Sequence, residues 1–499
     1  MHLKRDRKKS SALTLNLFQK LLFLQILVMK ILVYVFVVAC FLTLTEGAVD
    51  VCPPNDNSVY PADKCSCVKG DLLCQNLTSW PALSAPVELD ILTITNSHGL
   101  VIRNNTFQSL TVDRLTITHS KLRNTDFEEN AFGGLLVNDL DLSHNFLAEI
   151  PKAVRHITAL KGLDVSFNGI SGFEDANHIE TMKQIGNTLV RFAFGSTPDI
   201  DTWPTTLKHF PRLEELNCTG ADFSLMPINS FYGFENTLRK LNISNTYLYS
   251  VPLAVGRLNY LTELSLNHNH LIGDFGMNVP IVSTYLTHLS KISLDDDNIT
   301  MFPNILGVFR SLTEISMNGN NLKFVSEESA KSIHKITHLS LRNSGITRIP
   351  GTLQYISSLE SVDLSENGIH TIERKDLQEL TNLKELKLND NPIIYLSDNA
   401  FTKSENINLV EMRNTNLTRI PCGLKILRLV NHDLTLDFRF NKIECTCALR
   451  WLYDWKNGGY GTISHNLNIL GDCVTIQSSL QDYLENNLAA CPTYNSCGI

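Results

Sequence analysis

Residues 359–369 read L-E-S-V-D-L-S-E-N-G-I, and residues 383–393 restate the phrase as L-K-E-L-K-L-N-D-N-P-I. Both stretches carry apolar residues at positions 1, 4, 6 and 11 and an asparagine at position 9. The apolar residues at positions 4 and 6 alternate with polar ones, which is the period of a strand with one buried face. The asparagine comes where that strand must turn, and its amide can satisfy the backbone groups that the turn frees. The phrase therefore predicts a short strand, a turn and a return segment.

The same phrase occurs fifteen times along the chain, with spacings of 23 to 29 residues that are typical of leucine-rich repeats. We place the repeat starts at positions 89, 112, 137, 160, 189, 213, 238, 261, 289, 312, 336, 359, 383, 407 and 433. A single repeat does not bury enough apolar surface to offset its loss of conformational entropy, so neighbouring repeats must share one core. The sequence predicts an α/β fold, a leucine-rich-repeat solenoid over residues 89–440 that curves like a horseshoe around a parallel concave sheet.

Cysteines flank this array on both sides. They are Cys52, Cys65, Cys67 and Cys74 before the first repeat, and Cys445, Cys447, Cys473 and Cys491 after the last one. C-x-C pairs in an exported chain predict disulfide-stapled caps rather than a zinc site, because no second C-x-x-C or histidine pair accompanies them. We expect an N-terminal cap over residues 48–88 and a C-terminal cap with a short tail over residues 441–499. The spacing alone allows three pairings in each cap.

The flanking sequences also resemble a known group of proteins. The run C-P-P at residues 52–54, followed by C-S-C at 65–67, resembles the N-terminal flanking module of animal extracellular leucine-rich-repeat proteins. The run from Asn441 to Trp455, with C-T-C at 445–447, resembles their C-terminal flanking module. This resemblance implies the disulfides Cys52–Cys67, Cys65–Cys74, Cys445–Cys473 and Cys447–Cys491.

A second resemblance concerns the N-terminal repeats. The phrases L-T-I-T-N at residues 92–96, L-T-I-T-H at 115–119 and A-F-G-G-L at 131–135 are similar to arthropod secreted proteins grouped with the non-catalytic subunit of a shrimp luciferin monooxygenase. That resemblance implies a carrier or stabilising subunit without catalysis of its own. The complete C-terminal cap and the long array depart from the pattern.

The N-terminus predicts export. Residues 31–45 are apolar, Met29 and Lys30 precede them, and small residues stand before Ala48. We interpret residues 1–47 as an extension and signal peptide that starts at Met29 and is cleaved before Ala48. The alternative is a signal anchor over residues 17–45, but its lysines leave too short an apolar span. No apolar span follows Cys491, so we expect a secreted, extracellular protein without an integral membrane anchor.

Charge and sequons agree with this location. Removal of residues 1–47 takes away seven basic and two acidic residues and leaves 36 against 49, a net charge of −13. Such a field makes nucleic acid an unsuitable partner. Six N-x-S/T sequons suit an exported chain; they are Asn76, Asn104, Asn217, Asn242, Asn298 and Asn416.

The register also indicates where a ligand would bind. Positions 2, 3, 5, 7 and 8 of each repeat should project from the concave sheet, and position 5 holds mostly small polar residues. Asn217 and Asn242 share position 5 on neighbouring strands, about 5 Å apart, so a glycan on either would cover the middle of the face. We therefore expect contacts in the N-terminal third, in the charged C-terminal repeats or on the longer loops of residues 171–188 and 272–287.

Two clusters are candidate binding surfaces. His119 and His144 share position 8 of adjacent repeats, with Asp139 and Asp141 beside them. Paired imidazoles can bind zinc or titrate near neutral pH, although solvated polar side chains are the simpler interpretation. The second cluster lies in the C-terminal repeats and would steer a charged partner or form a ladder between strands; its residues are Lys387, Glu411, Arg413 and Arg439.

Three cysteines remain after the caps and the signal peptide. Cys218 replaces leucine at buried position 6 of the sixth repeat, so we expect an inert core thiol. Cys422 and Cys497 either pair with each other or leave Cys497 free for a disulfide-linked partner. The acidic run at residues 295–298 lacks the spaced loop and closing glutamate of a calcium site, and predicts a turn.

No catalytic motif is present. The chain has no nucleophile elbow, H-E-x-x-H motif or phosphate-binding glycine loop, so we predict no catalytic, cofactor or metal residues. The expected function is that of a secreted, non-enzymatic binding protein that recognises a protein ligand in matrix adhesion, development or immunity. The alternatives are a non-catalytic accessory subunit of a secreted enzyme and the ectodomain of a truncated receptor.

Overall fold

The computed structural model describes Cys52, residues 60 and 61, and residues 63–492 with gaps at 82, 84–85, 197–199, 272–285, 323–324, 405, 428–432 and 458–466. The predicted signal peptide with its start at Met29, most of the loop at 272–287, and Cys497 lie outside the described residues. No helix in the described ranges is long and apolar enough to cross a membrane.

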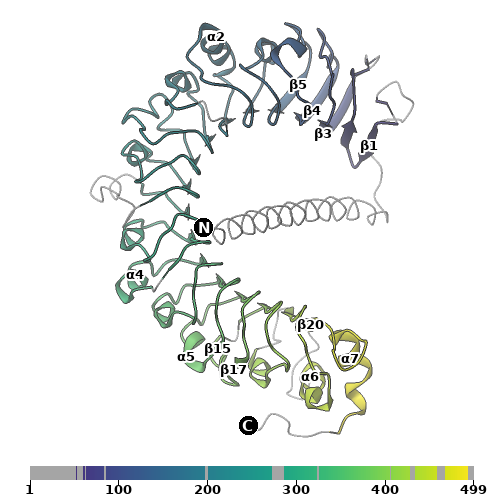
Figure 1. Cartoon of the computed structure of the whole chain (residues 1–499), viewed down its shortest axis with the longest axis vertical. Helices are drawn as coiled ribbons and strands as arrows, with labels where there is room; N and C mark the ends of the chain where they lie inside the picture. Colours follow the sequence, from purple (N-terminus) through teal and green to yellow (C-terminus); the bar gives the residue numbers. More distant parts are fainter. Residues whose placement is uncertain are drawn as a thin grey trace, which may run out of the picture.

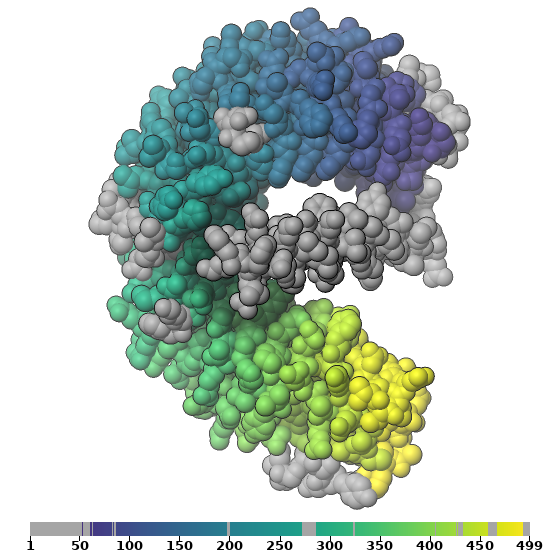
Figure 2. All heavy atoms as spheres, viewed as in Figure 1, coloured from purple at the N-terminus to yellow at the C-terminus, as the bar shows by residue number. Residues whose placement is uncertain are grey.

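The repeats stack side by side along a curved solenoid whose ends are the two caps (Figures 1 and 2). A continuous 18-stranded sheet runs through them, and successive repeat strands pair in parallel. The fifteen repeat strands are β3 (Val87–Thr95), β4 (Leu110–Thr118), β5 (Leu136–Asp141), β6 (Gly162–Asp164), β7 (Arg191–Ala193), β8 (Glu215–Asn217), β9 (Lys240–Asn242), β10 (Glu263–Ser265), β11 (Lys291–Ser293), β12 (Glu314–Ser316), β13 (His338–Ser340), β14 (Ser361–Asp363), β16 (Glu385–Lys387), β18 (Leu409–Glu411) and β19 (Leu434–Asp437). The predicted solenoid is confirmed.

The sheet continues into both caps, which the repeat pattern did not predict. Strand β1 (Cys65–Val68) pairs antiparallel with β2 (Asp71–Gln75), and β2 pairs in parallel with β3. At the other end, β20 (Leu467–Leu470) pairs in parallel with β19. Four disulfides staple the caps, with the pairs that the resemblance implies; they are Cys52–Cys67, Cys65–Cys74, Cys445–Cys473 and Cys447–Cys491.

Helices and short strands form the outer part of the solenoid and the C-terminal cap. Their bounds are α2 (Ala176–Ile185), α4 (Glu327–Ser332), α5 (Arg374–Leu377), α6 (Arg450–Lys456) and α7 (Leu480–Asn486), with β15 (Thr371–Ile372) and β17 (Tyr395–Leu396) in a separate parallel pair. Trp451 and Trp455 lie on one face of α6 and are both buried. Helix α2 lies within the predicted loop of residues 171–188, and its buried His178 accepts a hydrogen bond from the backbone N–H of Ile150 through Nε2 at 3.0 Å.

Asparagines at position 9 form a ladder along the interior of the solenoid. Oδ1 of Asn145 accepts hydrogen bonds from the backbone N–H groups of Ser120 and Leu122 in the preceding repeat, at 3.1 and 3.2 Å. Its Nδ2 donates to the carbonyl of Ile117 at 2.7 Å. Asn168, Asn269, Asn320, Asn367, Asn391 and Asn441 repeat this arrangement. The predicted role of position 9 is confirmed, and it explains how the short strands end without leaving buried polar groups unpaired.

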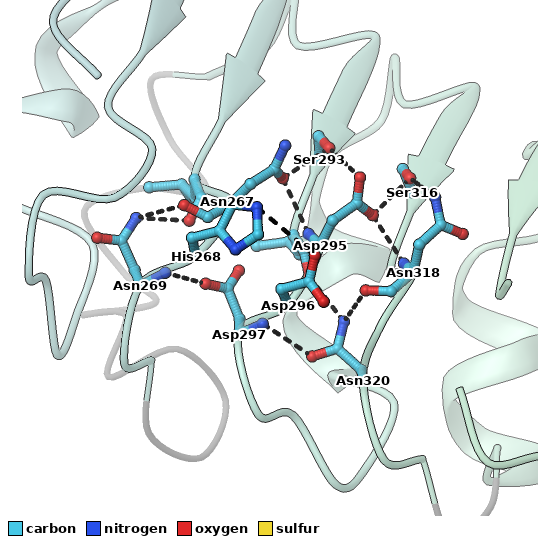
Figure 3. A network of polar contacts seen from close by, with 12 residues as sticks. Asn267, His268, Asn269, Ser293, Asp295, Asp296, Asp297, Ser316, Asn318 and Asn320 are labelled. Atoms are coloured by element: carbon cyan, nitrogen blue, oxygen red, sulfur yellow. Dashed lines mark hydrogen bonds and ion pairs between the residues drawn. The ribbon is translucent and has the colours of Figure 1, made fainter. Parts of the chain in front are cut away.

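Repeat nine departs from this ladder, because its position 9 is an aspartate (Figure 3). Oδ1 of Asp297 accepts a hydrogen bond from the backbone N–H of Asn269 at 2.6 Å, and the Asp297 N–H donates to Oδ1 of Asn320 at 3.2 Å. Oδ2 takes the place of the asparagine NH₂ group; it is buried and has no hydrogen-bond partner among the described residues. Burial raises the pKa of Asp297 to about 7, and the charges of Asp295 and Asp296 also raise it. The carboxyl can therefore act as a donor in the ladder only while it is protonated.

Position 8 has a second regularity, which the sequence analysis missed. The residue at this position has a positive φ in every repeat, from 50° at Asn343 and Asn414 to 81° at Gly220. Left-handed backbone is unusual for a residue as bulky as phenylalanine, yet Phe167 adopts it, as His119 and His144 do in the two preceding repeats. The turn therefore projects these large rings from the edge of the concave sheet.

Candidate functional site

A shallow cavity of about 350 Å³ lies along the concave face from β4 to β10. Its lining comes from two columns of side chains, at positions 3 and 5 of the repeats, because these positions flank the buried residue at position 4. The charged residues of the two columns are arranged differently in the middle of the array and in its N-terminal third.

Position 3 forms a ladder of alternating charge across the middle strands. The residues that meet in register are Arg191, Glu215, Lys240, Glu263, Lys291 and Glu314. Nζ of Lys240 lies 3.2 Å from Glu215 and 3.7 Å from Glu263, and Nζ of Lys291 lies 3.2 Å from Glu314. Burial of charge is small here, so each pair contributes only about 0–1 kcal/mol. These carboxylates are therefore poor binding sites for a cationic ligand, because each already has a lysine next to it.

At the N-terminal end of this ladder, a glycine allows two charged residues to pair across the strand that lies between them. Arg191 on β7 donates to both carboxylate oxygens of Asp139 on β5 at 2.8 Å, across Gly162 of the intervening β6. A Cβ at Gly162 would lie 1.8 Å from Oδ1 of Asp139, so the missing side chain is what lets the two residues meet. Asp139 therefore belongs to the ladder of position 3 and is paired with Arg191.

The N-terminal third carries a stack of three rings. The centroids of His119 and His144 are 4.5 Å apart with an interplanar angle of 14°, and those of His144 and Phe167 are 4.1 Å apart with an angle of 10°. Partial burial and the neighbouring His119 lower the pKa of His144 from its ordinary value. Parallel stacking at this distance turns ring faces rather than ring nitrogens toward each other. No group of three or more metal-ligating side chains occurs in the described part of the chain.

Two carboxylates lie next to this stack. Asp141 and Asp164 are register partners at position 5 of β5 and β6, and both act on His144 electrostatically. Burial raises the pKa of Asp164, as does the charge of Asp141, while hydrogen bonds from Ser166 lower it. Within the described residues, no lysine or arginine forms an ion pair with either carboxylate. Like charges directly opposite each other on adjacent strands are unfavourable, so a cation would relieve this pair.

The C-terminal candidates also come together, but each of them already belongs to an ion pair. Arg413 lies 2.8 Å from Glu411 and 3.3 Å from the buried carboxylate of Asp437. Arg439 lies 2.7 Å from the same carboxylate. Lys387 is a looser neighbour of Glu385, at 3.8 Å. Asp437, which sequence analysis did not single out, is the residue that joins this cluster.

The sequon asparagines lie at the surface. Asn217 and Asn242 are register partners on β8 and β9 and face the concave side, as their shared column predicts. The other four sequon asparagines are exposed as well; they are Asn76, Asn104, Asn298 and Asn416. Occupancy by glycans stays a prediction.

The remaining cysteines differ from each other. Cys218 is a buried free thiol, and burial raises its pKa, so it stays protonated and unreactive. Cys422 is disulfide-bonded. Because Cys497 lies outside the described residues, its pairing stays a prediction.

Comparison with known proteins agrees with this architecture. Residues 334–393 match the family described as Leucine rich repeat. Chaoptin of Tribolium castaneum is 29% identical over 212 residues, which cover 37% of this chain and 26% of chaoptin. Lumican of Gallus gallus is 25% identical over 290 residues, which cover 50% of this chain and 78% of lumican. The chain has a leucine-rich-repeat fold and is similar to both proteins, although it spans only about a quarter of the beetle chaoptin.

Solved structures share the fold. A leucine-rich-repeat protein of Leptospira interrogans aligns with a TM-score of 0.52 and 20% identity, over 74% of this chain and 89% of that protein. A chain from the glycosylated Toll–Spatzle complex of Drosophila aligns with a TM-score of 0.51 and 15% identity, over 75% of this chain and 58% of that one. Both likenesses concern the fold alone.

Proposed function

We propose that the chain is a secreted, non-enzymatic binding protein that recognises a protein ligand with the N-terminal third of its concave face. The observation that carries this proposal is the contrast between charged columns. At position 3 of the middle repeats, Glu215, Glu263 and Glu314 pair with lysine. In the C-terminal repeats, Glu411 and Asp437 pair with arginine. Asp141 and Asp164, by contrast, lie directly opposite each other without such a partner among the described residues. Phe167 in repeat four is exposed and stacks on His144, on which both acids act electrostatically. Aromatic side chains are enriched at protein interfaces, and an acidic pair without a cation favours a basic partner through electrostatic complementarity.

Secretion is supported by the caps. Disulfides persist in oxidising compartments and are rare in the cytosol, and both caps carry two of them. The exposed sequons and the resemblance to extracellular leucine-rich-repeat proteins point the same way. Similarity to lumican and chaoptin adds support for a leucine-rich-repeat scaffold that binds protein.

Affinity capture from the fluid into which the protein is secreted tests the function. Wild-type protein and two double variants would serve as baits: Asp141→Asn with Asp164→Asn, and the control Glu129→Gln with Asp201→Asn. Glu129 and Asp201 are exposed residues outside the repeat strands, so both variants lose the same charge. We expect one protein to be retained at fixed stoichiometry by the wild type and the control but not by the first variant. Retention of no protein by any bait would contradict the function.

A further inference from the structure

Phe167 is the last ring of a stack, and its second face has no ring on it. Position 8 continues with Ser196 and Gly220 in the next two repeats. The Ser196 hydroxyl donates to the carbonyl of Thr219 at 3.1 Å, toward the following repeat. Phe167 stays 48% exposed, a large fraction for a phenylalanine that already stacks on His144. Among the described residues, no other ring packs on it.

The stack is held in place by backbone geometry, which keeps this face oriented. The N–H of Phe167 donates to the carbonyl of Gly195 at 2.9 Å, and the N–H of His144 donates to that of Ser166 at 3.1 Å. Both rings therefore project from hydrogen-bonded turns instead of a loose loop. A ligand that stacks on Phe167 would lose little of its own affinity to ordering of the receptor.

The neighbouring carboxylates define the charge of that ligand. Asp141 and Asp164 line one concave cavity with two arginines, Arg114 and Arg191. Arg191 is taken up by Asp139, and Arg114 on β4 forms no ion pair with either acid among the described residues. His144 does not neutralise them near neutral pH, because its pKa is lowered. Asp164 precedes Phe167 by three residues in repeat four, so an acid and a free aromatic face belong to the same repeat, and the second acid lies on the neighbouring strand.

We propose that the edge of the concave sheet beside Phe167 binds an arginine side chain of the protein ligand, with the guanidinium stacked on the free face of Phe167 and an N–H group donating to Asp164, while Asp141 on the neighbouring strand adds negative charge. A guanidinium is planar and weakly hydrated, and it can stack on a ring while it forms hydrogen bonds with carboxylates. An ammonium group satisfies the acids but gains less from the ring. This inference rests on the proposed function and names the chemistry of its ligand.

Hexa-arginine, hexa-lysine and hexa-citrulline, each with a fluorescent label, are suitable probes for anisotropy titrations with the full secreted chain. We expect hexa-arginine to bind about two- to fivefold more tightly than hexa-lysine, which is the range of a partly exposed cation–π contact. Hexa-citrulline, which is uncharged, should not bind. Phe167→Ala should remove the preference for arginine, and Phe167→Tyr, which keeps the ring, should retain it.

Asp141→Asn with Asp164→Asn should weaken both cationic probes by about tenfold, as expected for loss of charge-assisted hydrogen bonds. The control Glu129→Gln with Asp201→Asn should not, although it has the same net charge. Equal binding of the two cationic peptides, or equal weakening by the two double variants, would overturn the inference. In that outcome, continued capture of a protein by the wild type would leave the proposed function standing, so the two failures are distinguishable.

Discussion

Repeats three and four and repeats seven to nine follow the same phrase but differ both on the surface and inside. On the surface, Asp141 and Asp164 adjoin each other without a cation, whereas Lys240 lies between two glutamates and pairs with both. Inside, Asn168 completes the hydrogen-bond ladder in repeat four, but Asp297 interrupts it in repeat nine. The residues in the same column of the neighbouring repeats therefore decide whether a charged residue is available to a ligand. They also decide whether it destabilises the fold.

The variant Asn168→Asp tests whether a carboxylate destabilises the asparagine ladder in repeat four. Nδ2 of Asn168 donates to three carbonyls, those of Leu142, Val165 and Ser166, and a carboxylate would face the same oxygens without a proton to donate. We expect a loss of about 3 kcal/mol in the free energy of unfolding at neutral pH, measured by chemical denaturation. Asn168→Ser is the matched control, since Ser344 fills the equivalent position and donates to Met317. An equal loss in both variants would show that the charge is not the cause.

Asp297→Asn should have the opposite effect. The amide would supply the missing donor, and we expect the variant to be about 1–3 kcal/mol more stable than the wild type above neutral pH. The pKa of Asp297 is raised to about 7 in the folded chain, against about 3.9 in an unfolded one. The stability from its protonated form is complete below pH ~4 and is lost as the pH rises through 7.

Thermal melts of the wild type and Asp297→Asn between pH 4 and 8 measure this difference. The two curves should converge at the acidic end and separate as the pH rises. A difference that stays constant with pH would mean that Asp297 does not titrate in this range.

The variant Lys240→Gln tests whether a lysine partner keeps the acids of the middle repeats from binding a cation. This change leaves Glu215 and Glu263 without their shared lysine and creates a second site with two free acids. Hexa-lysine and hexa-arginine should then both bind about two- to fivefold more tightly, the range of one added exposed ion pair. The gain should be equal for the two peptides, because the two glutamates can form an exposed ion pair with either cation. A gain for hexa-arginine alone would contradict the role assigned to Phe167.

Glycans should produce the smallest effect on binding. Peptide mapping by mass spectrometry reports whether Asn217 and Asn242 are occupied. If ligand contacts lie near Phe167, the variants Asn217→Gln and Asn242→Gln should leave affinity for the protein ligand unchanged. A strong gain in affinity on their removal would place the contact in the middle of the concave face.

The same peptide map, run without reduction, reports whether Cys422 is joined to Cys497.

The repeat register was predictable from the sequence because core positions are fixed by strand period and by burial. Leu364 at position 6 and Asn367 at position 9 illustrate this, since both are buried as the phrase predicts. The disulfide pairs followed from a resemblance rather than from spacing. The sequence analysis also found His119, His144 and Asp141, but it paired them with Asp139, which lies with Arg191 instead.

The contacts that sequence analysis missed depend on column neighbours rather than on the phrase itself. The importance of Gly162 becomes clear only when Asp139 and Arg191, the residues at the same position of the two neighbouring repeats, are considered with it. The alternation of acidic and basic residues at position 3 could have been predicted by comparing that position across the repeats, as was done for position 5. Asp297 was interpreted as part of a turn, and its place in the asparagine ladder was the available signal.

Photo-crosslinking tests the central claim most directly. A benzoylphenylalanine introduced at Ala193 lies beside Asp164 in the column of position 5, and one at Ser265 lies in the same column beyond the sequon strands. Irradiation in the native secreted fluid should join the protein ligand to the probe at position 193 and not to the probe at 265. Crosslinking at 265 alone would contradict the account.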